Sequence, residues 1–226
     1  MESTLLADEL ADKIKSRIKR GLYVQNERLT VRRLCEDFKV SETPVKQALN
    51  QLVAVGLVVA IPKCGIKVKS FDFEEMRHIW RARQMIEQYC AASAIESVKN
   101  SDKIRNKIKH LLEQTDSEYE KCAEYFTQET FGKLSEHDYA LHKELVKTCG
   151  NPVIITEYEN LHTHQCMFVG FHIHNAKSLR LTIQQHDEIV DALFSADLLR
   201  LQKAICEHID TTIELYKKAH RNLPVI

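Results

Sequence analysis

Residues 40–49 read VSETPVKQAL, and this stretch decides how the first third of the chain folds. Ser41 is a preferred N-cap residue, so a helix is predicted to begin directly after it. Pro44 falls in the first turn of that helix, where its missing backbone N–H leaves no hydrogen bond unmade. The apolar residues that point to one face are Val45, Leu49, Leu52 and Val53. The stretch therefore predicts a helix with one buried side and one polar side.

The segments on either side predict two more helices and a hairpin. Apolar residues recur every fourth position from Leu6 to Ile18, which predicts a helix that ends near Gly21. Residues 31–38 suit a short helix with Thr30 as its N-cap. Residues 58–61 and 66–69 are β-rich and are separated by a turn at 62–65. Three helices and a two-stranded wing make a winged helix-turn-helix, predicted for residues 1–70.

The rest of the chain is predicted to be an all-α helical bundle, residues 71–226, which makes the fold mainly α. The period is helical nearly throughout, and Gly and Pro number only 6 and 4. The predicted helices lie near residues 73–98, 101–121, 124–148, 152–173, 178–195 and 197–219.

Composition indicates a globular protein of the cytoplasm. Hydrophobic residues make up 44% of the chain and charged residues 28%, which argues against disorder. The 7 Cys include no CxxC pair, and no signal peptide is recognised, so reduced thiols are expected rather than disulfides. The longest apolar run, near residues 52–61, is too short to span a membrane. A cytoplasmic location without membrane contact is therefore expected.

Charge is distributed unevenly along the chain. Residues 1–70 hold 13 Lys and Arg against 8 Asp and Glu, a balance of +5, whereas the whole chain has a net charge of zero. A basic first third favours binding to a polyanion such as DNA. The alternative interpretation is a solvated helix face beside an ordinary charged hairpin.

The candidate DNA contacts lie on the second and third helices and on the wing. Gln47 and Asn50 are suited to adenine edges, and Lys46 to guanine or a phosphate. Arg32 and Arg33 begin the second helix, which crosses the DNA backbone in proteins of this kind. The predicted contact residues are Arg32, Arg33, Ser41, Thr43, Lys46, Gln47, Asn50 and Lys63.

The motifs together resemble the GntR family of winged-helix regulators. That family runs VSRTPVREAL at residues 40–49, followed by EGLV and PxxGxxV, which here are VGLV at 55–58 and PKCGIKV at 62–68. The downstream part is similar to the FadR branch with its FCD effector-binding domain. The motifs that carry this second resemblance are Arg83-x-x-Ile86-Glu87, Asp138-x-x-x-His142, Gly150-Asn151-Pro152, His186-x-x-Ile189, Asp197, Ala204 and His208. The resemblance extends from about Leu6 to Tyr216.

This sequence departs from the family pattern in the helix expected to read DNA. Glu42 and Lys46 stand where the family usually has arginines, and Gln47 replaces a glutamate. Glu42 has the wrong sign for a phosphate contact. The operator sequence therefore cannot be carried over from relatives.

The resemblance implies a metal site formed by Asp138, His142, His186 and His208. Asp138 and His142 are four residues apart, so both point from one face of one helix. Three imidazoles and a carboxylate suit Zn²⁺, Ni²⁺ or Mn²⁺ better than Ca²⁺ or Mg²⁺. The alternative for each histidine is a surface or hydrogen-bonded core residue.

The resemblance also implies a small carboxylate effector bound beside the metal. Arg83 is a candidate to hold its carboxylate, although a structural ion pair with Glu87 competes for the same side chain. Arg180 and His164 are further candidates for effector binding. Members of this group are homodimers, so two reading heads are expected on a pseudo-palindromic operator in double-stranded DNA.

The function expected from these observations is a metal-dependent, carboxylate-responsive transcription regulator, most simply a repressor. One alternative is a DNA-binding protein whose metal is only structural. Another is a metalloenzyme, which the sequence disfavours because it contains no HExxH and no evident general base beside the four ligands.

Overall fold

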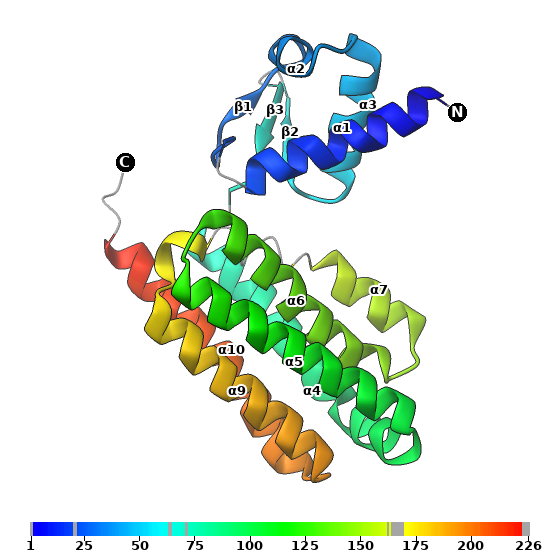
Figure 1. The fold of residues 1–226 in the computed structure, drawn as a ribbon, viewed down its shortest axis with the longest axis vertical. Helices are drawn as coiled ribbons and strands as arrows, with labels where there is room; N and C mark the ends of the chain where they lie inside the picture. The colour runs from blue at the N-terminus through cyan, green and yellow to red at the C-terminus, as the bar shows by residue number, and fades with distance from the viewer. Residues whose placement is uncertain are drawn as a thin grey trace. The chain divides into compact units, whose positions relative to one another are not determined.

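The computed structural model describes residues 2–19, 22–62, 65–70, 72–161, 163 and 170–222. The chain divides into two compact units, Met1–Phe71 and Asp72–Ile226. Helices dominate the described residues, as predicted (Figure 1). No helix in these ranges is both long enough and apolar enough to cross a membrane.

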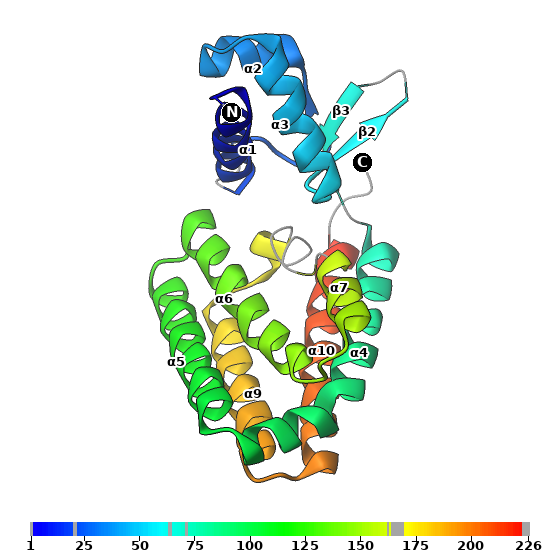
Figure 2. The same ribbon diagram turned by 90° about the vertical axis from the view of Figure 1, so that its right-hand side faces the viewer.

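The first unit is a three-helix domain with a small antiparallel sheet. Its helices are α1 (Glu2–Lys19), α2 (Val31–Phe38) and α3 (Glu42–Ala54). The strands β2 (Val58–Ile61) and β3 (Gly65–Val68) form the predicted hairpin, with Val59 opposite Lys67 (Figure 2). A further strand, β1 (Arg28–Leu29), pairs with the other edge of β3 and was not predicted, because two residues cannot show an alternating pattern.

The start of each short helix follows from its capping residue. The Thr30 side chain accepts a 3.2 Å hydrogen bond from the Arg33 backbone N–H, as expected of an N-cap. Ser41 occupies the N-cap position of α3 in an extended conformation, but its side chain makes no capping hydrogen bond. The hydroxyl of Ser41 is exposed instead.

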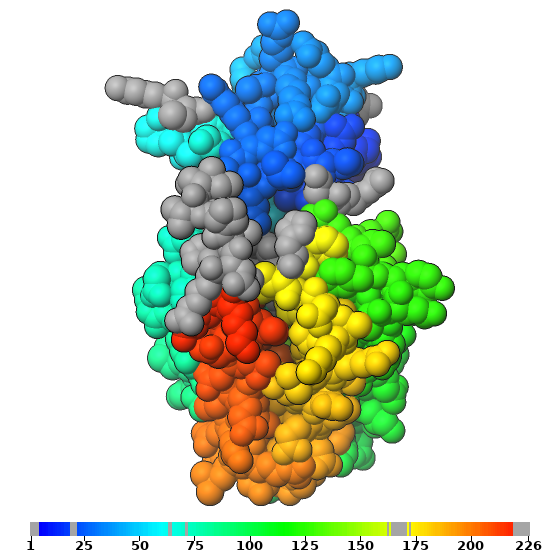
Figure 3. All heavy atoms as spheres, turned by 90° about the vertical axis from the view of Figure 1, so that its left-hand side faces the viewer, coloured from blue at the N-terminus to red at the C-terminus, as the bar shows by residue number. Residues whose placement is uncertain are grey.

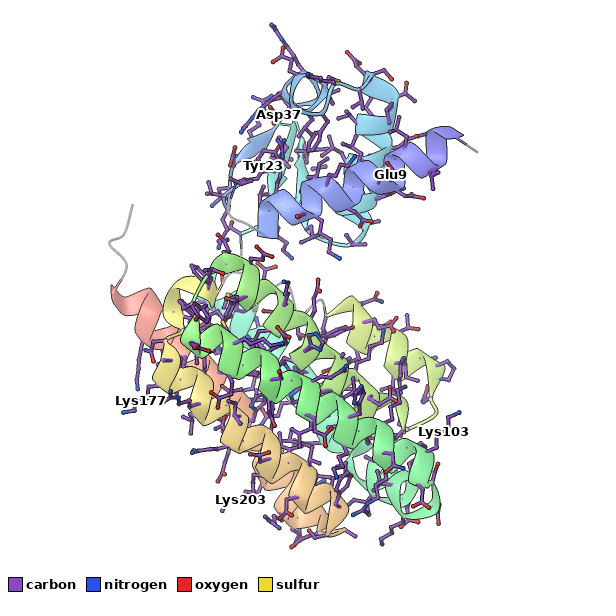
Figure 4. The ribbon with its side chains drawn as sticks, in the orientation of Figure 1. Glu9, Tyr23, Asp37, Lys103, Lys177 and Lys203 are labelled. Carbon is purple, nitrogen blue, oxygen red and sulfur yellow. The ribbon has the colours of Figure 1, made fainter. Side chains whose placement is uncertain are left out.

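A single core joins the elements of this unit. Its fully buried residues come from all three helices and from the sheet, among them Ile14, Leu34, Val45, Leu49 and Val58. The Oη of Tyr23 donates a 2.7 Å hydrogen bond to Asp37, and the two residues lie close together in Figure 4. Arg17 bonds both of them, so this network ties the end of α1 to α2.

The second unit is a bundle of long helices. They are α4 (Phe73–Asn100), α5 (Asp102–Glu124), α6 (Gln128–Lys147), α7 (Pro152–Asn160), α9 (Ala176–Phe194) and α10 (Leu198–Asn222), with a 3-10 turn η1 (Gly170–Ile173). Helix α6 packs on α4 and α5, and α9 packs on α5 and α10. Helices α9 and α10 run side by side along the face shown in Figure 3.

One predicted helix is wrong in its extent. A single helix over residues 152–173 was expected, but α7 ends at Asn160 and Gly170–Ile173 forms a 3-10 turn. The cause lies in the apolar pattern. Ile154, Ile155, Tyr158 and Leu161 pack inward, but the sequence His-Thr-His-Gln at 162–165 then interrupts the apolar period. The predicted helix also covered residues 162 and 164–169, which lie outside the described residues.

Candidate metal and DNA-binding sites

Four potential metal ligands meet in the interior of the helical bundle. Asp138 and His142 lie one turn apart on α6, His186 lies on α9 and His208 on α10. One ligand atom from each lies within 4.8 Å of the others, and all four side chains are buried. The structure therefore brings together the four residues selected from the sequence, from three helices.

The distances between these side chains are short. The Nε2 of His186 lies 3.2 Å from Oδ2 of Asp138 and 3.2 Å from Nε2 of His142. The His208 ring lies 5.0 Å from the His142 ring and 4.8 Å from the His186 ring, measured between centroids. At such distances a shared proton or a cation must lie between the atoms. The two imidazole nitrogens and the carboxylate oxygen are all suitable ligands for a metal cation.

Further side chains hold the four residues in position. The Nδ1 of His142 lies 3.1 Å from Oε2 of Glu87 on α4. Tyr158 donates a 2.7 Å hydrogen bond to the other oxygen of Glu87, and Tyr119 donates a 2.9 Å bond to Oδ2 of Asp138. A carboxylate behind a ligating histidine is a recurrent arrangement in metal sites, because it fixes the ring and its tautomer.

Electrostatics favour the metal-binding state of Asp138, His142 and His208. Burial lowers the pKa of His208 well below its usual value, and the neighbouring His186 and His142 lower it further. Burial and the charge of Arg83 lower the pKa of His142. Burial alone would raise the pKa of Asp138, but His186, His142 and Arg83 outweigh it, so that pKa is well below its usual range. Neutral imidazoles beside an ionised carboxylate are what a divalent ion requires.

The donor set also fits a metal by what it leaves unsatisfied. Within the described part of the chain, Oδ1 of Asp138 and Nδ1 of His208 are buried and have no hydrogen-bond partner. Nδ1 of His186 is also unpaired, but it lies on the far side of the ring from the Nε2 that faces Asp138 and His142. Buried polar atoms are normally satisfied, so the first two atoms indicate a missing partner. Nitrogen donors with one carboxylate fit Zn²⁺, Ni²⁺ or Mn²⁺.

Of the three residues predicted to bind the effector, one lies beside the ligand cluster and one is exposed. Arg83 is buried and donates a 2.6 Å hydrogen bond from Nε to Glu87, while its Nη1 lies 3.8 Å from Oδ1 of Asp138. The ion pair considered as the alternative is thus present, and it lies against the ligand cluster. Arg180 is exposed. Because it precedes His186 by six residues, it points about 120° away around α9 and not into the cluster. His164 lies outside the described residues.

The predicted DNA contacts lie on the exposed side of α3 and on α2. Pro44, Val45, Ala48 and Leu49 are buried on one side of α3. The exposed residues of α3 and its N-cap include Ser41, Thr43, Lys46, Gln47 and Asn50. The structure thus separates a packing face from a polar face, as predicted from the sequence. Lys63 lies outside the described residues.

Acidic residues accompany the cations of this surface. The Nζ of Lys46 lies 2.7 Å from Glu42, Arg32 pairs with Glu36 at 3.1 Å, and Arg33 pairs with Glu27 at 2.5 Å. All three pairs lie on the protein surface, where such pairs contribute little to stability.

Two residues beside the four-residue ligand cluster had no signal in the sequence. Tyr119 and Tyr158 come from α5 and α7 and reach Asp138 and Glu87 only through the packing of the bundle. Burial raises the pKa of each hydroxyl well above its usual value, so both remain protonated donors. Glu87 was recognised from the sequence as a partner of Arg83, but not as the carboxylate behind His142.

A winged helix-turn-helix domain and a helical domain with a buried ligand cluster together define a DNA-binding transcription regulator. Residues 6–68 match the family described as bacterial regulatory proteins, gntR family, and residues 78–211 match the FCD domain. The chain therefore belongs to the GntR family of regulators and carries an FCD domain. These are families of regulators and not of enzymes.

Individual relatives agree with this assignment. The chain is 24% identical over 213 residues to the HTH-type transcriptional repressor GlaR of Escherichia coli K12, covering 91% of this chain and 93% of GlaR. It is 25% identical over 233 residues to the Exu regulon transcriptional regulator of the same organism, covering 93% and 84%. The solved structure of E. coli McbR/YncC has the same fold, with a TM-score of 0.72, 20% identity and coverage of 95% and 98%.

Proposed function

We propose that this regulator is a metal-dependent repressor that responds to a small carboxylate. The observation that carries the proposal is the convergence of Asp138, His142, His186 and His208 within 4.8 Å in a buried setting. Asp138 Oδ1 and Nδ1 of His208 have no hydrogen-bond partner among the described residues. GlaR, to which the chain is similar, is a transcriptional repressor, and this similarity supports the direction of regulation.

In this proposal the chain's own residues prepare the site. The four ligands would hold the ion, Glu87 would orient His142, and Tyr119 would orient Asp138. A bound divalent ion supplies concentrated positive charge and open coordination positions for an anionic ligand. Arg83 lies beside the ligand set and keeps Nη2 free of any partner within the described residues. It would add a second positive charge for the same carboxylate.

The sensor would act on DNA through the helices that carry the ligands. Helices α6, α9 and α10 carry the four ligands, and α4 carries Glu87 and Arg83 beside them, so a ligand bound there would change how these helices pack. A coupling free energy of about 1–3 kcal/mol, or roughly 5- to 150-fold in affinity, is ordinary for such a switch. A homodimer would place two α3 helices on a pseudo-palindromic operator.

The test uses the full chain and a DNA duplex obtained by in vitro selection for binding to it. Bound duplexes are first selected from a random pool, and metal is measured in the purified protein by elemental analysis. Binding to the selected duplex is then titrated with a panel of carboxylic acids, with and without a chelator. We expect a stoichiometric transition metal, and at least one acid that weakens DNA binding only while the metal is present.

Two outcomes would count against the proposal. Protein that holds a metal but binds DNA equally with every acid would favour a purely structural ion. Protein that retains no metal, and whose DNA binding does not change with chelator, would remove the sensor altogether. The GntR assignment would stand in both cases, because it does not depend on the metal.

A further inference from the structure

A carboxylate occupies the first position of the helix predicted to read DNA. Glu42 is the first residue of α3, and 67% of its side chain is exposed. In a helix-turn-helix the second helix lies in the major groove, with its N-terminal residues against the base edges. Glu42 is therefore placed to meet a base, where its charge excludes a phosphate as its partner.

Lys46 neutralises this carboxylate in the free protein. Its Nζ lies 2.7 Å from Oε2 of Glu42, one turn further along α3. Through this hydrogen bond and through its charge, Lys46 holds the pKa of Glu42 below its usual value, so the carboxylate is ionised at neutral pH. Within the described residues, Oε1 of Glu42 accepts no hydrogen bond. Glu42 thus keeps one oxygen for a new donor.

Glu42 belongs to a row of polar side chains that runs along α3. Glu42, Lys46 and Asn50 are four residues apart, so each is turned by about 40° from the one before it. All three are exposed, whereas Val45 and Leu49 are buried on the packing side of the helix. The carboxylate therefore lies in one row with residues already predicted to contact bases.

A carboxylate distinguishes the four bases in the major groove because it can only accept hydrogen bonds. Guanine presents two acceptors there, and thymine presents an acceptor and a methyl group, so neither base can donate to it. Adenine presents a donor beside an acceptor, and that acceptor repels the carboxylate. Cytosine presents its amino group without a neighbouring acceptor on the same base. An ionised carboxylate on a base edge therefore selects cytosine.

We infer that Glu42 is a specificity-determining residue, which accepts a hydrogen bond from the amino group of one cytosine in each half-site. It was not among the contacts predicted from the sequence, because its charge is wrong for a phosphate. The inference concerns the DNA-binding domain alone. It depends neither on the metal nor on the effector, so it can fail without the proposed function failing.

The alternative is that Glu42 only stabilises α3. A carboxylate in the first turn of a helix interacts favourably with the helix dipole, and an oppositely charged pair four residues apart stabilises an exposed helix. Either effect changes the stability of the helix, but neither favours one base over another. Base preference therefore separates the two roles.

The experiment is in vitro selection of duplexes by the full chain, repeated with variants at position 42. The wild-type protein is expected to select a site with a fixed cytosine in each half. Glu42→Ala is expected to lose the preference at that position and to keep the others. Glu42→Gln is expected to select adenine there, because an amide can accept from N6 and donate to N7 at the same time.

Equilibrium binding to duplexes that differ only at this base pair measures the size of the effect. The wild-type protein should bind the cytosine duplex about 5- to 30-fold more tightly than the others, and Glu42→Ala should bind all of them about equally. Lys46→Met should weaken binding to every duplex but keep the cytosine preference. Glu36→Gln is the matched control, because Glu36 is also an exposed carboxylate paired with a cation four residues away. It should leave the base preference unchanged.

Three results would overturn the inference. Selection of the wild-type site by Glu42→Ala would show that the carboxylate reads no base. A preference relaxed at a base other than cytosine would exclude the assigned donor. Loss of the cytosine preference in Lys46→Met would assign the reading to Lys46, with Glu42 only holding it in place. Urea denaturation of each variant confirms that the domain is folded in all these comparisons.

Discussion

The Nδ1 of His142 lies 3.1 Å from Oε2 of Glu87, and both side chains are shielded from solvent. Glu87 also accepts hydrogen bonds from Arg83 and Tyr158. Burial alone would raise the pKa of Glu87, but Arg83 and His142 outweigh it, so that pKa is lowered and the carboxylate stays ionised. His142 is therefore held with Nδ1 toward a negative charge and Nε2 toward the other ligands.

Replacing Glu87 with Gln is expected to weaken metal binding. Loss of the charge behind His142 makes its ring a poorer ligand, and partners of this kind typically contribute about 10- to 100-fold in metal affinity. Competition with a chromophoric chelator measures the effect. Glu96→Gln, an exposed site on the same helix, is the matched control. Unchanged affinity in a folded Glu87→Gln protein would contradict the positioning role.

Replacing His186 with Gln is expected to abolish stoichiometric metal binding. His186 supplies one of four ligands and contacts both Asp138 and His142. The amide keeps most of the side-chain volume, so far-UV circular dichroism should show the bundle intact. His110→Gln, on the exposed side of α5, should retain its metal. Elemental analysis of both proteins decides the matter.

Tyr23→Phe is expected to destabilise the DNA-binding domain slightly. The Tyr23 hydroxyl bonds Asp37 at 2.7 Å and accepts from Arg17 at 2.9 Å. Arg17 and Asp37 also bond each other directly, so the loss should be about 0.5–1.5 kcal/mol in the free energy of unfolding. Urea denaturation measures it, with Glu9→Gln as the exposed control. A loss several times larger would mean that the network stabilises more of the domain than these bonds account for.

Two substitutions on the predicted DNA-binding surface should have different kinds of effect. Asn50→Ala is expected to cost about 1–3 kcal/mol on the selected duplex and to relax preference at one base pair. Arg32→Ala is expected to weaken binding to all sequences and to reduce the logarithmic salt slope by less than about 1, because Glu36 already pairs with Arg32 in the free protein. Equilibrium binding at several salt concentrations, on specific and scrambled duplexes, separates the two. Equal effects on both duplexes for Asn50→Ala would exclude base reading there.

The stability of the helical domain is expected to fall as the pH falls from about 6.5 to about 4. Burial lowers the pKa of His174 from 6.5 to about 4. Between these values the unfolded chain binds a proton that the folded chain does not, so stability rises with pH across this window. The contribution of His174 is up to about 3 kcal/mol. His174→Phe should flatten the profile of metal-free protein in urea denaturation, and an unchanged profile would contradict this.

The fold was largely predictable because its elements carry strong local signals. Thr30 caps α2 as expected, and the long helices of the second unit begin and end within a few residues of their predicted bounds. Strand β1 and the break after Asn160 were missed, because a two-residue strand and an irregular apolar pattern give no periodic signal. Ser41 stands at the predicted cap without using its hydroxyl.

The candidate site was predictable only in its ligand residues. Asp138, His142, His186 and His208 match a pattern along the chain, and the structure places them together, while their role as metal ligands stays a prediction. Tyr119 and Tyr158 reach the cluster through helix packing, which no spacing encodes. Arg180 was selected because it lies near His186 in the sequence, but its side chain is exposed. Nearness to a motif along the chain therefore does not place a residue in the site.

The surface ion pairs of α2 and α3 affect how strongly one winged helix-turn-helix domain binds DNA. If Lys46 and Arg32 contact phosphates as predicted, each exchanges a carboxylate on a neighbouring turn for a phosphate, so docking releases fewer counterions than the number of cations suggests. A single head would hold its half-site weakly, and tight binding would come from avidity, with both half-sites engaged at once. In the proposed homodimer, a small change in the spacing of the two DNA-binding domains would then release the whole complex.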